Sequence, residues 1–206
     1  MEIKTVVVGD CGTNCYLLSG EDFAVIIDPG YNDIRVREFA LQNEQKENKA
    51  ILLTHCHFDH IGGVNEIKNI WQCDVIIGES EKEGLKNPNV NFSAFWGDEV
   101  WSIIADKGVT DGETLKFGSF ETKVLHTPGH TAGSVCYLCD NVLFSGDILF
   151  NMSIGRTDLP TGSYETEIAS LKRLLELEPN ITIYSGHGPK TTIFYEKLHN
   201  PYIKEF

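Results

Sequence analysis

The 206-residue sequence predicts an α/β fold in which helices cover packed β-sheets. Short runs rich in β-branched residues recur along the chain, and most end in Gly, Pro or Asp, as strands do where they enter turns. Segments with helical periodicity lie between several of these runs. The first runs follow one another as hairpins would, and the later ones alternate with helices. This mixture disfavours a purely parallel doubly wound sheet.

Nine β-branched runs are the predicted strands, and each is bounded by turn-forming residues. In chain order they are residues 3–9, 14–19, 23–30, 49–54, 73–78, 120–129, 134–139, 141–147 and 181–188. Helices are predicted over Asp33 to Gln45, over His60 to Ile70, and near the end of the chain around His199. The sequence has no linker, charge block or low-complexity segment, so residues 1–206 are expected to form one domain.

The clearest predicted helix follows Gly162. Ser163 is suited to be its N-cap, and Glu165 and Glu167 place negative charge in the first turn, where the helix dipole favours it. Pro179 is expected to end the helix. The residues expected on its buried face are Tyr164, Ile168, Leu171 and Leu175.

Composition excludes several classes of partner. There are 17 Lys and Arg residues against 30 Asp and Glu residues, and the resulting net charge of -13 opposes nucleic-acid binding. We find no apolar run long enough to span a membrane and no signal-peptide pattern at the start of the chain. The sequence therefore predicts a cytoplasmic protein that acts on a small-molecule substrate; its oligomeric state is not predicted.

The six cysteines are expected to be free thiols, because reducing conditions in the cytoplasm disfavour disulfides. A zinc site made of Cys11, Cys15, Cys136 and Cys139 is the alternative. Cys136 and Cys139 lie on a predicted strand, however, where residues three apart face opposite sides. This alternation favours buried free cysteines.

One segment does not fit the pattern of strands and helices. Residues 87–101 are partly polar yet contain Phe92, Phe95, Trp96 and Trp101. Three interpretations remain open: a loop whose aromatic side chains pack on the domain, a lid or wall of a pocket, or a dimer contact.

Metal-ligand side chains gather where the predicted strands end. His55, His57, Asp59 and His60 directly follow the strand over residues 49–54. Three more candidates end later strands or follow them, namely His130, Asp147 and His187. Imidazole and carboxylate ligands suit zinc, iron or manganese better than copper(I). The pattern H-x-H-x-D-H is too specific to be a chance arrangement.

Strand geometry divides these candidates between two ions. His55 and His57 lie two residues apart at a strand end, so they point the same way and can share one ion. The same alternation directs Cys56 to the opposite side. Asp59 and His60 come one turn later and suit a second ion.

With these residues, the chain resembles the metallo-β-lactamase superfamily, whose signature is H-x-H-x-D-H followed by a distant His, Asp and His. The resemblance implies a four-layer αββα sandwich of two mixed sheets flanked by helices, and two divalent metal ions, zinc first with iron or manganese as alternatives. The roles that the resemblance implies for each residue are His55, His57 and His130 on the first metal, Asp59, His60 and His187 on the second, and Asp147 as the bridge.

Other stretches resemble the small glyoxalase II-like hydrolases, namely "GDILFNMSIGRTDLP" at residues 146–160 and "SGHGPKTTI" at residues 185–193, followed by Glu196 and Asn200-Pro201. The longer glyoxalase II enzymes carry a C-terminal helical domain that helps to bind glutathione, and this chain is expected to lack it. The implied activity is hydrolysis of a thioester or related ester by a metal-bridging hydroxide. Asp59 is the candidate catalytic residue, which would orient that hydroxide or handle its proton.

Two alternatives remain. A persulfide dioxygenase with a single iron shares the "GRTD" and "THCH" stretches but differs around the last histidine. A non-catalytic, metal-stabilised binding module needs only four closed ligands, fewer than the seven found here.

Four further residues have competing interpretations. Arg156 is either a clamp for a substrate carboxylate or the partner of Asp158 in an ion pair. Asp28 is expected to support the site or a turn and not to bind metal. His126 is expected to be structural, because Pro128 and Gly129 interrupt any helix between it and His130. His199 is expected at the surface or in packing.

Overall fold

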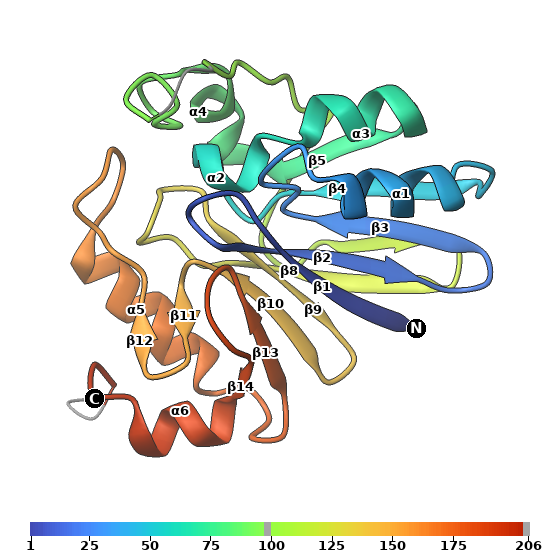
Figure 1. The fold of residues 1–206 in the computed structure, drawn as a ribbon. Coiled ribbons are helices and arrows are strands. Elements are labelled where there is room, and N and C mark those ends of the chain that lie inside the picture. Colours follow the sequence, from blue (N-terminus) through green and yellow to red (C-terminus); the bar gives the residue numbers. More distant parts are fainter. Residues whose placement is uncertain (97–99, 204–206) are drawn as a thin grey trace.

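The computed structural model describes residues 1–96 and 100–203 and has the expected four-layer αββα architecture. Two six-stranded sheets pack face to face, and helices cover their outer faces (Figure 1). The predicted fold class is therefore confirmed. Gly97, Asp98 and Glu99, which belong to the aromatic segment, lie outside the described residues.

The first sheet has the strand order β1-β2-β3-β4-β5-β6. Its strands β1, β2 and β3 form two consecutive antiparallel hairpins, as the sequence predicts, and β3 to β6 run parallel. Their bounds are Glu2–Val8, Thr13–Ser19, Phe23–Ile27, Asn48–Leu52, Asp74–Gly78 and Lys107–Val109.

The second sheet has the order β14-β13-β10-β9-β8-β7 and is antiparallel except for the parallel pair β10 and β13. In chain order, β7 to β10 are Thr114–Phe117, Phe120–His126, Val135–Cys139 and Val142–Gly146, and β13 and β14 are Thr182–Ser185 and Thr191–Thr192. A small antiparallel pair joins β11 (Leu149–Phe150) to β12 (Ser153–Ile154).

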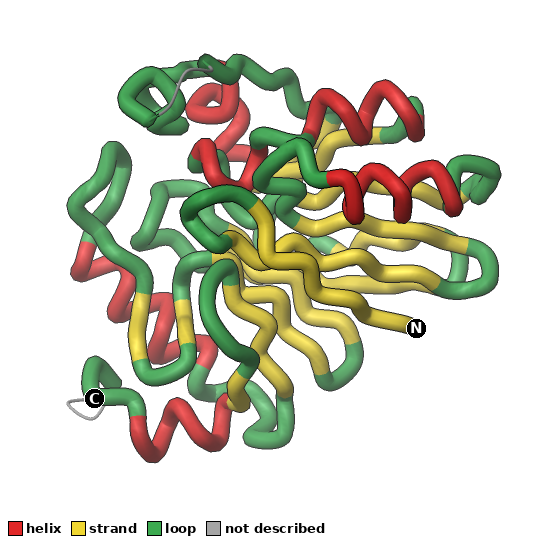
Figure 2. The backbone as a smooth tube through the Cα atoms, in the orientation of Figure 1, coloured by secondary structure: helices red, strands yellow, loops and turns green. Residues whose placement is uncertain are grey.

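Helices cover both outer faces of the sandwich, as Figure 2 shows. The first sheet is covered by α1 and α3, and the second by α5 and α6. The helices α1 to α6 span Ile34–Gln42, Phe58–Ile61, Val64–Trp71, Lys82–Lys86, Tyr164–Leu174 and Ile193–His199, and a 3-10 turn, η1, spans Glu79–Glu81. None of the helices in the described part of the chain is long and apolar enough to cross a bilayer.

Three groups of buried apolar side chains fill the spaces between the four layers. A single strand supplies two of these groups, because successive side chains on a strand point to opposite faces. On β2, Cys15 and Leu17 face the helices, whereas Tyr16 and Leu18 face the second sheet. Burial of the three groups excludes water from both faces of each sheet and fixes the strand ends that carry the site.

All nine predicted strands are present, with bounds that differ by a few residues. Five further strands, β6, β7, β11, β12 and β14, have no counterpart among the predictions. Each has only two to four residues. Runs so short show too little periodicity to be recognised, and their pairing is set by neighbouring strands that lie far away in the sequence.

The prediction of one helix over His60 to Ile70 is wrong, because α2 and α3 are separate helices with Gly62 and Gly63 between them. These glycines pack closely against the loop that follows β3. A Cβ on Gly63 would lie 2.6 Å from the carbonyl oxygen of Tyr31. The close approach of the two backbones sets the turn between the helices.

Helix α5 begins as predicted, since the Ser163 side chain accepts a hydrogen bond from the backbone of Thr166. Its predicted buried face needs one correction. Tyr164 is 59% exposed, whereas Leu171, Leu174 and Glu167 are buried. The helix ends at Leu174, before the expected stop at Pro179, so only three turns pack on the sheet.

Candidate metal centre

The seven predicted ligand side chains meet at one end of the sandwich. His55 and His57 follow β4, and Asp59 and His60 lie in α2. The other three come from the second sheet: His130 from the loop between β8 and β9, Asp147 directly after β10, and His187 after β13. The site thus forms across the edge where the two sheets meet.

Their potential ligand atoms fall into three overlapping groups, and within each group these atoms lie within 4.8 Å of one another. The groups are His55, His57 and His130; His55, His60 and Asp147; and Asp59, His60 and His187. The middle group shares His55 with the first group and His60 with the last, so Asp147 lies between the two ends of the cluster. Nδ1 of His57 is 2.8 Å from Nε2 of His130, and Nε2 of His187 is 3.2 Å from Oδ2 of Asp59.

The cluster fits divalent metal ions. Four buried atoms in it, Nε2 of His55, His57 and His60 and Oδ1 of Asp147, have no hydrogen-bond partner among the described residues. Buried polar atoms without partners are costly, and they are rare unless an ion or water satisfies them. Imidazole nitrogens with carboxylate oxygens form the donor set that zinc, iron and manganese accept.

Two of the histidines are held in the neutral form that binds metal. Burial, reinforced by the neighbouring His60, places the pKa of His55 well below its usual value. Burial and the adjacent His130 lower the pKa of His57 to about 3. Both rings therefore keep a lone pair available at neutral pH.

The two carboxylates of the cluster are ionised. Burial acts to raise the pKa of Asp59, but His60 and His187 outweigh it and lower the pKa to about 2. The pKa of Asp147 is also well below its usual value, because His60, His187 and His130 outweigh its burial. Burial likewise acts to lower the pKa of His187, yet hydrogen bonds to Asp147 and Asp59 raise it to about 9. Two buried negative charges thus require positive charge beside them.

Asp28 fixes the orientation of His60. Its carboxylate accepts hydrogen bonds from the backbone and the hydroxyl group of Thr54 and lies 3.0 Å from Nδ1 of His60. With a proton on Nδ1, Nε2 of His60 is free to face the cluster. As expected, Asp28 supports the site and belongs to none of the ligand groups formed by the described residues.

The ring of His130 is oriented by a backbone group. Its Nδ1 lies 2.7 Å from the carbonyl oxygen of Arg156. The Arg156 guanidinium itself is 62% exposed and forms a two-pronged ion pair with Asp158, at 2.7 and 2.8 Å. Of the two interpretations of Arg156, the ion pair is therefore present, and substrate binding stays a prediction.

Two residues that support the metal centre are not predicted from the sequence. Glu81 is buried, and its carboxylate accepts hydrogen bonds from the backbone of Cys56 and of Gly133, so it ties the loop of His55 and His57 to the loop of His130. Thr13 donates its hydroxyl hydrogen to Oδ2 of Asp59 at 2.9 Å. Neither residue lies in a recognisable pattern, because each acts through a contact that is distant in sequence.

The tip of the β1-β2 hairpin docks on the second sheet beside the site. Thr13 pairs with His187, and the Asn14 side chain donates to the carbonyl oxygens of Ser185 and Gly188. At Gly186, a Cβ would lie 2.0 Å from Oδ1 of Asp147, so only glycine fits beside that carboxylate.

The cysteines lie outside the cluster, as the alternation of strand residues predicts. Cys56 packs in the core between the first sheet and its helices, and Cys136 and Cys139 lie on opposite faces of β9 in two different cores. All six cysteines, each in the described part of the chain, are free. A site combining Cys15, Cys136 and Cys139 is wrong, because they occupy three separate interlayer spaces.

Two histidines are structural. A ring nitrogen of His126 lies 3.1 Å from the carbonyl oxygen of Ala132, and His199 packs against Tyr195 on α6. Neither belongs to a ligand group within the described residues.

A cavity of about 350 Å³ opens beside Asp59. We call it the aromatic cavity. Its lining residues are Val8, Gly9, Asp10, Cys11, Gly30, Tyr31, Phe58, Asp59, Trp96 and Trp101. Trp96 and Trp101 of the unassigned aromatic segment thus form part of a pocket wall.

Comparison with known sequences agrees with this site. Residues 8–187 match the family model of the metallo-beta-lactamase superfamily. The chain is 36% identical to the probable metallo-hydrolase YqgX of Bacillus subtilis, over 100% of this chain and 99% of that protein. It is also 36% identical to the hydroxyacylglutathione hydrolase GloC of Haemophilus influenzae, over 98% of each. The protein therefore belongs to the metallo-β-lactamase superfamily.

Solved structures with the same fold include three that bear on the chemistry. The BLEG-1 B3 metallo-beta-lactamase has a TM-score of 0.90 and 40% identity, covering 98% of this chain and 100% of that one. TTHA1623 in a di-iron-bound form has a TM-score of 0.78 and 34% identity, covering 97% and 99%. ETHE1 from Myxococcus xanthus has a TM-score of 0.80 and 28% identity, covering 100% and 85%.

Proposed function

We propose that this protein is a dinuclear metal-dependent hydrolase that cleaves a thioester or a related ester. The observation that carries the proposal is the set of seven converging ligand side chains, of which four buried atoms lack a hydrogen-bond partner among the described residues. The likeness to GloC, a hydroxyacylglutathione hydrolase, supports the choice of a thioester.

Each end of the cluster would hold one ion. His55, His57 and His130 are the proposed ligands at one end, Asp59, His60 and His187 at the other, and Asp147 lies between them. When bound, two divalent ions supply a nucleophile from water at neutral pH and stabilise the negative charge that develops on the carbonyl oxygen. Zinc is the first choice, and the di-iron form of TTHA1623 supports iron as an alternative.

The protein's own residues position the reacting groups. Thr13 and His187 both contact Oδ2 of Asp59, which fixes that carboxylate at the edge of the cluster. Its side chain is 15% exposed, and Asp59 is one of the residues that line the aromatic cavity, so it is accessible to a substrate and to water. Because this ionised carboxylate has a pKa of about 2, we assign to Asp59 the orientation of the attacking water and not the acceptance of its proton.

A persulfide dioxygenase with one iron is the second candidate, and the likeness to ETHE1 from Myxococcus xanthus favours it. Against it stands the complete second end of the cluster, with Asp59 held by Thr13 and His187. A single iron would leave one end of this ligand set without an ion.

Paired assays on the purified protein separate the two functions. A hydrolase releases free thiol from S-lactoylglutathione or from S-acetyl-N-acetylcysteamine and consumes no oxygen. A dioxygenase consumes oxygen with glutathione persulfide and cleaves neither thioester. The Asp59→Asn variant should lose hydrolysis by roughly a hundredfold or more, because the carboxylate that orients the attacking water is lost. Unchanged hydrolysis in that variant would remove Asp59 from the mechanism.

A further inference from the structure

We propose that the substrate carries an uncharged aromatic or bulky apolar group, which binds in the aromatic cavity while its carbonyl group reaches the metal centre. The inference rests on the proposed hydrolase function and specifies its substrate class. It would exclude glutathione thioesters as the preferred substrate.

The aromatic cavity adjoins the metal centre, because Asp59 lines the cavity and also belongs to a ligand group. Its lining residues come from the β1-β2 turn, the loop after β3 and the start of α2, together with Trp96 and Trp101. Its volume of about 350 Å³ is in the range of small-molecule sites, which begin at roughly 300 Å³. A group bound there would lie next to Asp59, whose carboxylate we propose to orient the attacking water.

Aromatic rings dominate one wall of this cavity. The Phe58 ring lies between those of Trp96 and Trp101, with centroids 5.5 and 6.4 Å away and interplanar angles of 30° and 12°. Trp96 remains 53% exposed, and Tyr31, which also lines the cavity, is 52% exposed. A flat apolar ligand that covers these rings would remove apolar surface from water and stack on it.

The walls are held in place before any ligand binds. The backbone of Phe58 donates to the carbonyl oxygen of Asn91, and the Asn91 side chain donates to that of Trp101 at 2.8 Å. At Gly30, a Cβ would lie only 1.8 Å from the backbone oxygen of Asp59, so the loop after β3 packs directly on α2. Preformed walls lower the entropic cost of binding.

The charges around the cavity disfavour an anionic substrate. Among its described lining residues the only charged side chains are Asp10 and Asp59, both acidic. The nearby Arg35 donates to the carboxylate of Asp33 and to the carbonyl oxygen of Val7. Glutathione carries two carboxylates, and apart from the metal centre no described lining residue of the cavity supplies a positive charge to pair with them.

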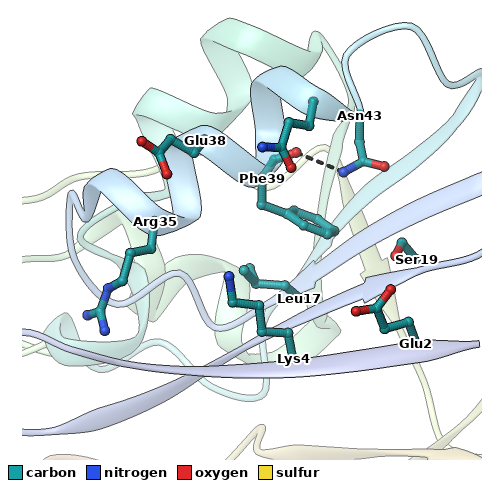
Figure 3. A pocket seen from close by; sticks show the side chains of 9 residues that line it. Glu2, Lys4, Leu17, Ser19, Arg35, Glu38, Phe39 and Asn43 are labelled. Carbon is teal, nitrogen blue, oxygen red and sulfur yellow. Dashed lines mark hydrogen bonds between the residues drawn. The ribbon is translucent and has the colours of Figure 1, made fainter.

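A second cavity of similar size is a contrasting example. It measures about 340 Å³, lies between β1, β2 and α1, and contains no proposed metal ligand. Figure 3 shows Lys4 and Arg35 around it together with Glu2 and Glu38. Cavity size alone therefore does not identify the substrate site, and of these two cavities it is the aromatic one that combines aromatic side chains with a proposed metal ligand.

Matched thioesters test this inference with the metal-loaded protein. S-phenylacetyl-N-acetylcysteamine and S-benzyl thioacetate place an aromatic ring on either side of the thioester, and S-acetyl-N-acetylcysteamine has none. We expect kcat/KM for at least one aromatic substrate to exceed that of the acetyl substrate by about tenfold or more, as for apolar groups that fill a pocket. Equal values would overturn the inference, and so would a higher kcat/KM for S-phenylacetylglutathione than for its N-acetylcysteamine counterpart.

Two neighbouring aromatic side chains provide a variant and its control. Trp96→Ala should lower the ratio of aromatic to acetyl kcat/KM at least about fivefold, since one wall of the cavity is lost. Phe95→Ala removes a more exposed ring that packs on Phe92 and does not line the cavity, so the ratio should stay as in the unmodified protein. A ratio that is unchanged in Trp96→Ala would contradict the assignment of the cavity.

A binding experiment separates this inference from the proposed function. Benzyl N-acetylcysteamine thioether and S-benzylglutathione cannot be hydrolysed at a thioester, and they differ in charge. We expect calorimetry to show at least tenfold tighter binding of the neutral thioether, and Trp96→Ala should weaken that binding. If this holds but no thioester is cleaved, the hydrolase proposal fails and the assignment of the cavity survives. If all thioesters are cleaved without preference, the hydrolase proposal survives and the assignment of the cavity fails.

Discussion

The metal cluster and the aromatic cavity meet at Asp59 but are built from different parts of the fold. The cluster consists of side chains at strand ends, and His55, His57 and His60 are each no more than 3% exposed. The cavity is lined mainly by loop residues, of which Trp96 is 53% and Tyr31 52% exposed. The comparison suggests that the rigid sheet edge determines the reaction and that the loops determine the substrate.

The largest effect is expected from Asp147→Asn, which changes the residue that lies between the two ends of the cluster. The variant loses a negative charge facing His60, His130 and His187. We expect loss of bound metal and a fall in thioester turnover of about a thousandfold, equivalent to several kcal/mol of transition-state stabilisation. Elemental analysis and kinetics on the same sample measure both. If the variant keeps its full metal content and turnover, Asp147 is not a functional part of the metal centre.

A smaller effect is expected from Asp28→Asn, which disturbs the orientation of His60 and leaves all seven proposed ligands in place. Residues that hydrogen-bond to a metal ligand contribute roughly ten- to a hundredfold to metal affinity. Titration with a metal-binding indicator should show a weakening in that range at one site. Asp22→Asn is the control, because Asp22 also accepts bonds from a backbone group and a hydroxyl, those of Ser119, but is far from the cluster. Equal affinity changes in both variants would exclude a specific role for Asp28.

The next prediction concerns the support beneath the cluster. Glu167 on α5 is buried, and both of its carboxylate oxygens lack a hydrogen-bond partner among the described residues. Burial is the main cause that raises its pKa to about 8. Since the folded protein then holds a proton that the unfolded chain releases near pH 4.5, stability should fall as the pH rises between about 4.5 and 8.

Glu167→Gln removes this titration. We expect the variant to be more stable than the unmodified protein by on the order of 1–3 kcal/mol at pH 8.5, with a smaller difference at pH 5. Denaturant unfolding at the two pH values measures the change. A difference that is the same at both values would show that Glu167 does not titrate in this window.

The smallest effect is expected at Arg156, which lies outside the aromatic cavity. Its guanidinium already pairs with Asp158, and the contact with His130 comes from its backbone. Arg156→Lys should therefore change KM by less than about threefold, in the range of an exposed ion pair. Steady-state kinetics with a neutral and an acidic thioester provide the measurement. A tenfold rise in KM for the acidic thioester alone would instead support the predicted clamp.

The sequence predicts the cluster better than it predicts its surroundings, and the reason is physical. The H-x-H-x-D-H pattern lies at the end of a strong strand, so strand geometry brings His55 and His57 to one side and removes Cys56. Glu81 and the Arg156 carbonyl act through backbone hydrogen bonds between distant segments, which leave no side-chain pattern.

The aromatic cavity could not be predicted from the sequence for the same reason. Phe58, Trp96 and Tyr31 come from three segments, and only the folded chain reveals that they surround one space. Their aromatic character alone is equally compatible with a packed loop. The break between α2 and α3 was missed for a related reason, because Gly62 and Gly63 are required by contacts with the distant loop after β3.

The most direct test of the proposed dinuclear hydrolase is to follow activity while metal is restored to metal-depleted protein. Zinc, iron or manganese is added in steps, and bound metal per chain and cleavage of S-phenylacetyl-N-acetylcysteamine are measured on the same samples. We expect hydrolysis to appear as the second ion binds and to be maximal at two ions per chain. Full hydrolysis with one ion or none, or oxygen uptake with one iron and no hydrolysis, would contradict it.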